Sequence, residues 1–143
     1  MQFRLAAMSD VKYVYELICD LEEKVLDYNS FQIIFEQYIE SESYLSILAI
    51  ENSSVIGCIN IRFEYQLHHA AGIAEIMELV VARNARSTGI GTRLFAEAEK
   101  LAKERGCVQL EVCCNQIRIR SHNFYEKQKM QNSHFKYTKT LTS

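Results

Sequence analysis

The chain has no proline and only five glycines among its 143 residues, at positions 57, 72, 89, 91 and 106. Without clusters of these residues there is no sign of a linker, and no internal repeat or low-complexity segment is present either. A chain of this length is enough for one domain with its own hydrophobic core. We therefore expect a single domain over residues 1–143.

Other absences exclude whole classes of function. No apolar run approaches the roughly 20 residues that span a bilayer, and the amino terminus has no apolar signal-peptide segment. The 16 Lys and Arg against 18 Asp and Glu give a net charge of −2, so there is no positive excess for nucleic-acid binding. The five cysteines include no Cys-x-x-Cys pair, and we interpret them as buried reduced thiols. We expect a cytoplasmic protein with no nucleic-acid partner, no membrane partner and no bound metal.

What is present is a regular alternation of strand-like and helix-like segments. Hydrophobic periodicity predicts strands at 3–7, 44–51, 55–65, 73–81, 108–114 and 133–141. It predicts helices at 11–25, 31–39, 94–105 and 118–128, the first with Ser9-Asp10 as its N-cap and Val25 as its last apolar position. This order predicts a mixed α/β fold with a central mixed sheet of about six strands flanked by helices, including one parallel βαβ unit.

Two turns and one strand are informative in more detail. The polar turn Asn52-Ser53-Ser54 predicts a β-hairpin, and Gly106 is well placed to end a helix in the left-handed conformation. In the strand 55–65, Ile59 and Ile61 share one parity with Val55 and Phe63, whereas Asn60, Arg62 and Glu64 occupy the other. We expect one face of this strand in the core and the other in polar surroundings.

The segment most typical of ligand binding is Arg86-Ser87-Thr88-Gly89-Ile90-Gly91-Thr92, between an apolar strand and an amphipathic helix. The two glycines allow close backbone approach, and the first amides of a helix are unpaired donors at the positive end of its dipole. Such a turn suits a pyrophosphate. It completes neither the P-loop nor the dinucleotide motif, because Leu94 stands where the latter needs its third glycine.

The pattern Arg-x-x-Gly-x-Gly after Glu-Leu-Val-Val resembles the signature of the GNAT family of N-acetyltransferases, which bind acetyl-CoA. The order of predicted elements is also similar to that family. Within it, the chain is most similar to the aminoalkylphosphonate N-acetyltransferases. The segments that carry this likeness are 14–19, 67–69, 75–81, 124–126 and 133–139.

The resemblance implies where acetyl-CoA binds. The pantetheine arm would pair with the backbone of Leu79, Val80 and Val81 in a gap opened by a β-bulge. The pyrophosphate would lie on the amides of Arg86, Ser87, Thr88, Gly89, Ile90, Gly91 and Thr92, with a charged contact from Arg86. Asn115 matches a position that bonds the CoA arm, although it is equally typical of a turn that ends a strand.

The resemblance also implies catalytic residues. The acceptor amine must be neutral to attack, so a carboxylate base is needed, and Glu75 matches the glutamate that serves in many family members. Glu78 is the second candidate, and the bulge decides which of the two points into the cleft. The alternative for each is a structural carboxylate held by a neighbouring Lys or Arg. Tyr125 matches the tyrosine near the CoA sulfur and is expected to protonate the leaving thiolate, while the Leu79 amide polarises the thioester carbonyl.

A phosphonate-bearing acceptor would also need cationic or hydrogen-bonding partners. The candidates are Arg62, His68, His69, Lys136 and Lys139, each of which is also typical of a solvated surface. His68, His69 and Glu75 are a candidate divalent-metal site, although no metal is predicted. The sequence departs from the family after the Phe-Tyr helix, where Lys129-Met130 replaces the usual glycine and aromatic residue. That departure puts the geometry of the following turn in question.

Three functions stay open at this stage. The first is acetyl-CoA-dependent N-acetylation of a small primary amine, with an aminoalkylphosphonate as the preferred acceptor. The second is the same transfer to another amine, such as a polyamine, an aminoglycoside or a protein amino terminus. The third is a CoA-binding module without catalysis. A homodimer is also expected, because the last predicted strand would leave an exposed sheet edge.

Overall fold

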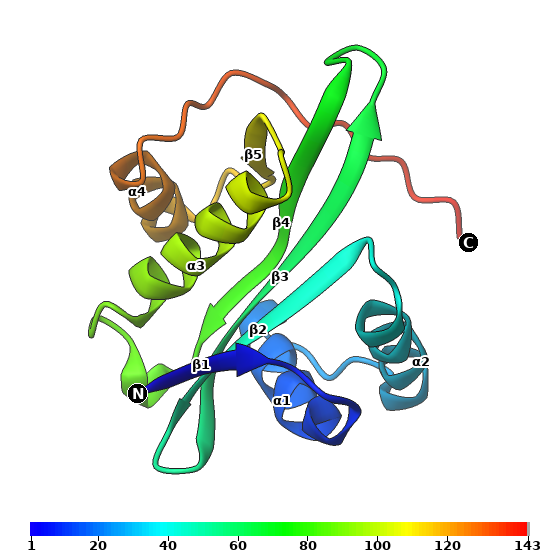
Figure 1. Cartoon of the computed structure of the whole chain (residues 1–143). Helices are drawn as coiled ribbons and strands as arrows, with labels where there is room; N and C mark the ends of the chain where they lie inside the picture. Colours follow the sequence, from blue (N-terminus) through cyan, green and yellow to red (C-terminus); the bar gives the residue numbers. More distant parts are fainter. Residues whose placement is uncertain (143) are drawn as a thin grey trace. The chain divides into compact units, whose positions relative to one another are not determined.

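The computed structural model describes residues 1–142 and divides into two units, Met1–Val112 and the residues from Cys113 onward. The first unit contains a five-stranded sheet whose strands are ordered as in the sequence. The strands are β1 (Gln2–Leu5), β2 (Tyr44–Glu51), β3 (Ser54–Gln66), β4 (Ala71–Val81) and β5 (Gln109–Val112) (Figure 1). Strands β1 to β4 pair antiparallel and β5 joins β4 in parallel. This mixed sheet confirms the predicted fold class, with five strands in the described chain instead of about six.

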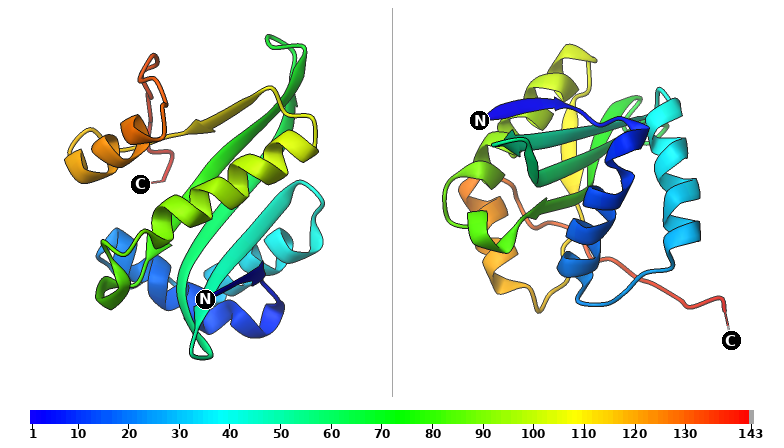
Figure 2. Two further views of the ribbon diagram at one scale, coloured as in Figure 1. Left: turned by 60° about the vertical axis from the view of Figure 1, so that its left-hand side comes forward. Right: turned by 90° about the horizontal axis from the view of Figure 1, so that it is seen from below.

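Helices cover both faces of this sheet. One face carries α1 (Val11–Glu22) and α2 (Tyr28–Glu40), and the other carries α3 (Ile90–Glu104), as the right-hand view of Figure 2 shows. Two short 3-10 turns, η1 (Met8–Asp10) and η2 (Arg83–Ala85), precede α1 and α3. The second unit contains α4 (Ile119–Lys127). No helix within residues 1–142 combines the length and the apolar character needed to cross a membrane.

The alternation of side chains along the strands explains the two halves of the core. Odd-numbered residues of β3 such as Ile59 and Ile61 are fully buried on the α3 face, where Leu94 packs. On the other face α1 and α2 pack against a cluster of buried residues: Val14, Leu17, Ile18, Phe35, Leu48, Cys58 and Val80. On this face the predicted polar surroundings of β3 are not solvent in the middle of the strand: Asn60 is only 3% exposed, and its partners are the side chains of Glu78 and Cys58.

The turns follow their sequence signals. Asn52 and Ser53 both have positive φ, 50° and 64°, as a two-residue hairpin loop of type I′ requires, so the predicted hairpin is confirmed. Gly106 has φ 79° and ends α3 in the left-handed conformation, as predicted. The first helix stops earlier than expected, at Glu22, because Glu23 takes the left-handed conformation. Val25 lies beyond the helix and is 88% exposed, so its assignment to the apolar face is wrong.

The predicted strand at 133–141 does not form. Residues 130–142 are neither helix nor strand, and Phe135, Tyr137 and Leu141 are at least 80% exposed. Alternation of apolar and polar residues favours an extended backbone, but a strand also needs a partner for its N–H and C=O groups. None of the five strands pairs with this segment in residues 1–142. The homodimer, which was expected from this strand, stays a prediction without that support.

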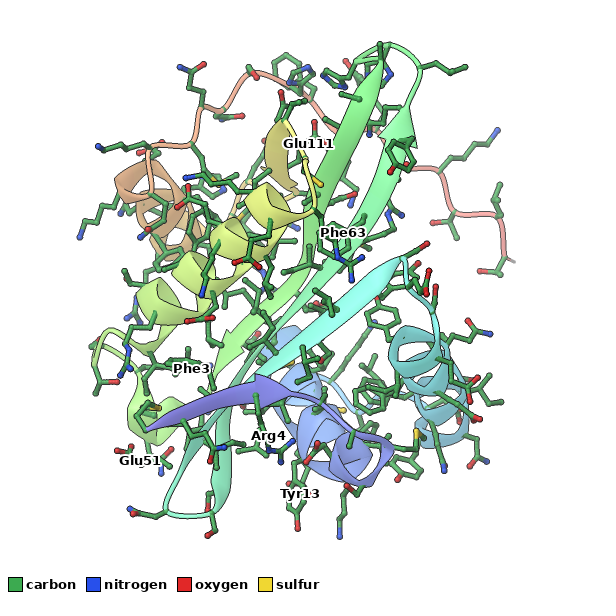
Figure 3. The ribbon with its side chains drawn as sticks, in the orientation of Figure 1. Phe3, Arg4, Tyr13, Glu51, Phe63 and Glu111 are labelled. Atoms are coloured by element: carbon green, nitrogen blue, oxygen red, sulfur yellow. The ribbon has the colours of Figure 1, made fainter. Side chains whose placement is uncertain are left out.

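An ion pair fixes the start of the fold. Asp10 is buried and accepts hydrogen bonds from both Nη atoms of Arg4, at 2.8 and 2.9 Å, and from the Ala7 amide at 2.8 Å. Arg4 and its neighbour Phe3 leave β1 on opposite sides, Arg4 toward α1 and Phe3 toward α3 (Figure 3). The hydrogen bond from Arg4 holds the pKa of Asp10 below its ordinary value.

We expect Asp10→Asn to lower the free energy of unfolding by about 2 kcal/mol at pH 7, because it removes charge-assisted hydrogen bonds. A carboxyl with a lowered folded pKa stabilises the protein above its unfolded pKa, about 3.9, and this stability is lost as the pH falls through the folded pKa. Urea unfolding at pH 7 and pH 3 should therefore show a difference that shrinks in acid. Asp27→Asn keeps an equally good cap of α2 and is the matched control. Equal stability of Asp10→Asn and the parent at pH 7 would contradict the assignment.

Candidate active site

A β-bulge in β4 brings the two candidate glutamates to one face of the sheet. Glu78 pairs with Asn60 and Ile76 pairs with Ile61, so Met77 is the extra residue. Residues three apart in a regular strand point to opposite faces. With the bulge, Glu75 lies opposite Arg62 and Glu78 opposite Asn60, and both carboxylates point to the face covered by α1 and α2.

Beyond the bulge, β4 continues without a neighbour on its β5 side. The pairing with β5 covers only Ile73 to Ile76, and in residues 1–142 no further strand continues it (Figure 1). The Ala82 amide donates to Ile56 O of β3 at 2.8 Å, and Val80 O lies 3.3 Å from where a Cβ of Gly57 would be. Since backbone groups alternate along a strand, the N–H groups of Leu79 and Val81 point the other way, into the unpaired side.

The segment 86–92 follows directly and also offers free donors. Within the described chain, the backbone N–H groups of residues 87–92 donate to no backbone acceptor, and the first bond of α3 runs from Arg93 N to Gly89 O. Gly89 has φ 85° and no atom within 4 Å of a would-be Cβ, so the backbone is open to a ligand there. Arg86 donates from Nε to Val81 O at 3.1 Å and from Nη2 to Asp20 at 3.3 Å. The predicted turn thus lies at the end of the unpaired edge of β4.

Glu78 is held by an amide rather than by a cation. Asn60 Nδ2 donates to its Oε1 at 2.8 Å, and Asn60 Oδ1 accepts the Cys58 thiol at 3.4 Å. The thiol bond fixes which end of the amide faces Glu78. Burial raises the pKa of Glu78 and the nearby Glu22 carboxylate adds to this, while the hydrogen bond from Asn60 opposes it. A carboxylate with a raised pKa is a better proton acceptor near neutral pH.

Glu75 is engaged differently. Arg62 Nη2 donates to Glu75 Oε1 at 2.7 Å and to Glu64 Oε1 at 2.8 Å. This arrangement matches the structural alternative for Glu75, a carboxylate held by a neighbouring arginine. Glu75 and Glu78 therefore lie on the same face but have different partners, a charged guanidinium for Glu75 and a neutral amide for Glu78.

Three residues near this pair were not identified from the sequence. Asn60 was assigned only to a polar parity, although a lone amide between Ile59 and Ile61 is a signal of a buried polar contact. Glu111 of β5, labelled in Figure 3, is in register with Glu75 and points to the same face. Tyr38 of α2 stacks on Tyr44, with ring centroids 4.3 Å apart, and its pKa is raised by burial and by the charge of Glu78.

The histidine pair lies elsewhere. His68 and His69 are exposed at the tip of the β3–β4 hairpin, where His69 Nδ1 lies 2.6 Å from Gln66 Oε1. Four residues of paired strand separate this tip from Glu75. The metal site suggested for His68, His69 and Glu75 is not formed, and no cluster of three or more metal-binding side chains occurs in residues 1–142.

The second unit carries four of the predicted site residues. Tyr125 lies on α4, and burial raises the pKa of its phenol to about 12. Asn115 Oδ1 accepts the Ile117 amide at 3.1 Å, which is the geometry of a turn residue. Lys136 and Lys139 belong to the exposed segment after α4. The turn after α4, which the Lys129-Met130 departure put in question, does form. Lys129 has φ 66°, and the Met130 amide donates to Tyr125 O at 3.2 Å, so the helix ends in the left-handed conformation without glycine.

A mixed sheet with an open edge on β4, free amides at the start of the next helix and a carboxylate beside the bulge together match the site that the sequence resemblance implies. Residues 11–130 match the model of the acetyltransferase (GNAT) family. The aminoalkylphosphonate N-acetyltransferase of Salmonella typhimurium strain LT2 is 37% identical over 140 residues, which cover 98% of this chain and 91% of that protein.

Solved structures show the same fold at low identity. A transcriptional regulator from Bacillus halodurans C-125 superposes with a TM-score of 0.89 at 22% identity, over 98% of this chain and 99% of that chain. A putative acetyltransferase from Agrobacterium tumefaciens strain C58 gives 0.87 at 18% identity, over 98% and 99%. The chain belongs to the acetyltransferase (GNAT) family. It is an N-acetyltransferase, and membership implies acetyl-CoA as its cosubstrate.

Proposed function

We propose that the chain transfers the acetyl group of acetyl-CoA to the primary amine of an aminoalkylphosphonate. The observation that carries the choice of acceptor is the 37% identity, over nearly the whole chain, to a protein named as an aminoalkylphosphonate N-acetyltransferase. Further support comes from Arg62, a cation beside the two candidate glutamates that suits an acidic group on the acceptor.

The proposed donor site combines the unpaired edge of β4 with the turn that follows. Leu79, Val80 and Val81 would receive the pantetheine arm, because the Leu79 and Val81 amides point to a side with no strand. The amides of residues 87–92 would hold the pyrophosphate, helped by the charge of Arg86 and by the helix dipole. Acetyl-CoA supplies the acetyl group as a thioester. The residues present fit it, since their donors are free where its acceptors would lie. The role of Asn115 remains a proposal from resemblance alone.

Among the two glutamates we propose Glu78 as the proton acceptor. An alkylammonium with a pKa near ~10 must lose a proton before it attacks, and Glu78 combines a raised pKa with a neutral hydrogen-bond partner. Glu75, held by Arg62, would orient the amine. The Leu79 amide would polarise the thioester carbonyl.

Tyr125 is proposed as the donor to the departing sulfur. A pKa of about 12 keeps its phenol protonated at neutral pH, so the hydroxyl is always available as a donor. The same value makes it a weaker acid than a thiol of pKa ~8.5. We therefore propose that Tyr125 donates a hydrogen bond to the thiolate rather than surrendering its proton completely.

One observation favours a second acceptor class. Glu64, Glu75, Glu78 and Glu111 share one face of the sheet, and Arg62 is the only cation on that face of β2 to β5 in residues 1–142. An acidic surface attracts polyamines and aminoglycosides. The same transfer to a polycation is therefore the alternative.

The test measures release of the CoA thiol from acetyl-CoA with a panel of acceptors at equal concentration. The proposal expects the largest kcat/KM for a short aminoalkylphosphonate. A larger kcat/KM for a polyamine or an aminoglycoside would contradict the aminoalkylphosphonate assignment and support transfer to a polycation. Absence of acceptor-dependent thiol release with every amine of the panel would remove both acceptor assignments.

A further inference from the structure

The hydrogen-bond donors of Arg62 are only partly used by its neighbours. A single nitrogen, Nη2, serves both Glu64 and Glu75, while the buried Nε has no hydrogen-bond partner in the described chain. A buried donor without an acceptor is rare in native proteins, since it loses its bond to water and gains nothing. The guanidinium therefore has donors to spare in this arrangement.

The ion pair between Arg62 and Glu75 is also accessible. The Arg62 side chain keeps 35% of its exposure and that of Glu75 keeps 19%. Separating a partly solvated pair costs less than separating a buried one, because water can take over part of the hydrogen bonding of both groups. Opening the pair would also release Nε from its unsatisfied position.

Within the described residues, the strands of the sheet offer no free cation that could replace Arg62 on this face. Arg4, the basic residue of β1 on the same face of the sheet, already donates two hydrogen bonds to Asp10. Arg105 stacks on the Phe63 ring at 4.2 Å, and Phe63 points to the opposite face of β3. An acidic group that enters the face between Glu75 and Glu78 has Arg62 as its partner.

We propose that Arg62 and Glu75 exchange partners when an acceptor binds, so that the guanidinium takes the acceptor's anionic group and the carboxylate takes its ammonium. This inference rests on the proposed function and deepens it. One internal ion pair is replaced by two pairs to the ligand, and the Arg62 fork can then bind an oxyanion with two parallel hydrogen bonds. The site therefore selects short zwitterionic amines. Because the two protein charges start in contact, a short spacer between the ligand's charges fits best.

The chemistry is shared by phosphonates and carboxylates, and the experiment separates them. The probes are aminoethylphosphonate, β-alanine and n-propylamine, which have similar length and carry a phosphonate, a carboxylate and no anion. Calorimetric binding to the CoA-saturated protein and kcat/KM are measured for each probe with the parent, Arg62→Gln and Arg62→Lys. Arg105→Gln, a charge removed on the opposite face, is the matched control.

We expect Arg62→Gln to weaken binding of the preferred zwitterion about 30-fold and that of n-propylamine less than about 3-fold. Arg62→Lys should recover part of the loss, because it restores the charge without the fork, and Arg105→Gln should leave the ratio unchanged. A preference for phosphonate over β-alanine in the parent identifies the tetrahedral anion as the ligand, and the reverse preference identifies the carboxylate.

Two results separate this inference from the proposed function. Arg62-dependent binding of a zwitterion without acetyl transfer would contradict the proposed function and would still support the exchange of partners. Transfer to an aminoalkylphosphonate whose affinity ratio to n-propylamine does not change in Arg62→Gln would overturn the exchange and leave the function standing.

Discussion

Glu78→Gln should lower kcat about 10²- to 10⁴-fold while the affinity for CoA is unchanged, because general-base catalysis contributes a factor of that size. Gln keeps the shape and can still accept from Asn60 Nδ2, so the bond that orients this side chain survives. The measurement is kcat for the acceptor and calorimetric affinity for CoA. Glu64→Gln, which removes a carboxylate of the same face, is the matched control and should change kcat far less.

The pH profile provides an independent check. A base works only when deprotonated, so activity falls as the pH drops through the pKa of Glu78, which lies above that of an ordinary glutamate. Removing the opposing hydrogen bond with Asn60→Leu should move this acid limb to higher pH. If Glu75→Gln abolished the limb and Glu78→Gln kept it, the base would be Glu75.

Replacing the Leu79 amide by an ester, through the hydroxy acid of leucine, should lower kcat about 10²- to 10³-fold, the usual effect of losing one oxyanion-type donor. The ester has nearly the same shape and lacks only the N–H that points to the unpaired side of β4. Its effect should appear in kcat with little change in the free energy of unfolding, because that N–H has no partner in the sheet.

The same exchange at Ala82 is the control. Its amide donates to Ile56 O at 2.8 Å, so the ester should cost stability and leave kcat nearly intact. A loss of kcat at Ala82 equal to that at Leu79 would show that the change acts through strand pairing, and the proposed role of the Leu79 amide would be wrong.

Much of the fold follows from local signals. The bounds of β2, Tyr44–Glu51, coincide with the predicted strand, and α3 covers the predicted helix 94–105 up to Glu104 and buries Leu94, Phe95, Ala98 and Ala102 at helical spacing. In each of these segments the hydrophobic periodicity alone is enough to predict the element, because no other interaction changes its ends. The first helix and the segment 133–141 differ because their outcome depends on backbone conformation at Glu23 and on a pairing partner, which no periodicity encodes.

The site was predictable in its residue types and not in its geometry. The sequence indicated that a bulge would decide between Glu75 and Glu78, but the position of the extra residue, Met77, depends on the register against β3. That register places Arg62 against Glu75 and Asn60 against Glu78, and so sets their different surroundings. His68 and His69 were grouped with Glu75 by nearness in sequence, whereas a hairpin places its tip far along the strand from its middle.

The bulge at Met77 divides β4 into two segments, each with its own alternation of side chains between the two faces of the sheet. In the proposed function, residues 71–76 contribute the Glu75 side chain that orients the amine, and residues 78–81 contribute the Glu78 base and the main-chain groups for the thioester. Exchanging the first segment together with its partner stretch 61–66 of β3 would leave the second segment's alignment unchanged. We therefore expect that exchanging these two segments between relatives changes the acceptor preference and leaves the binding of the coenzyme intact.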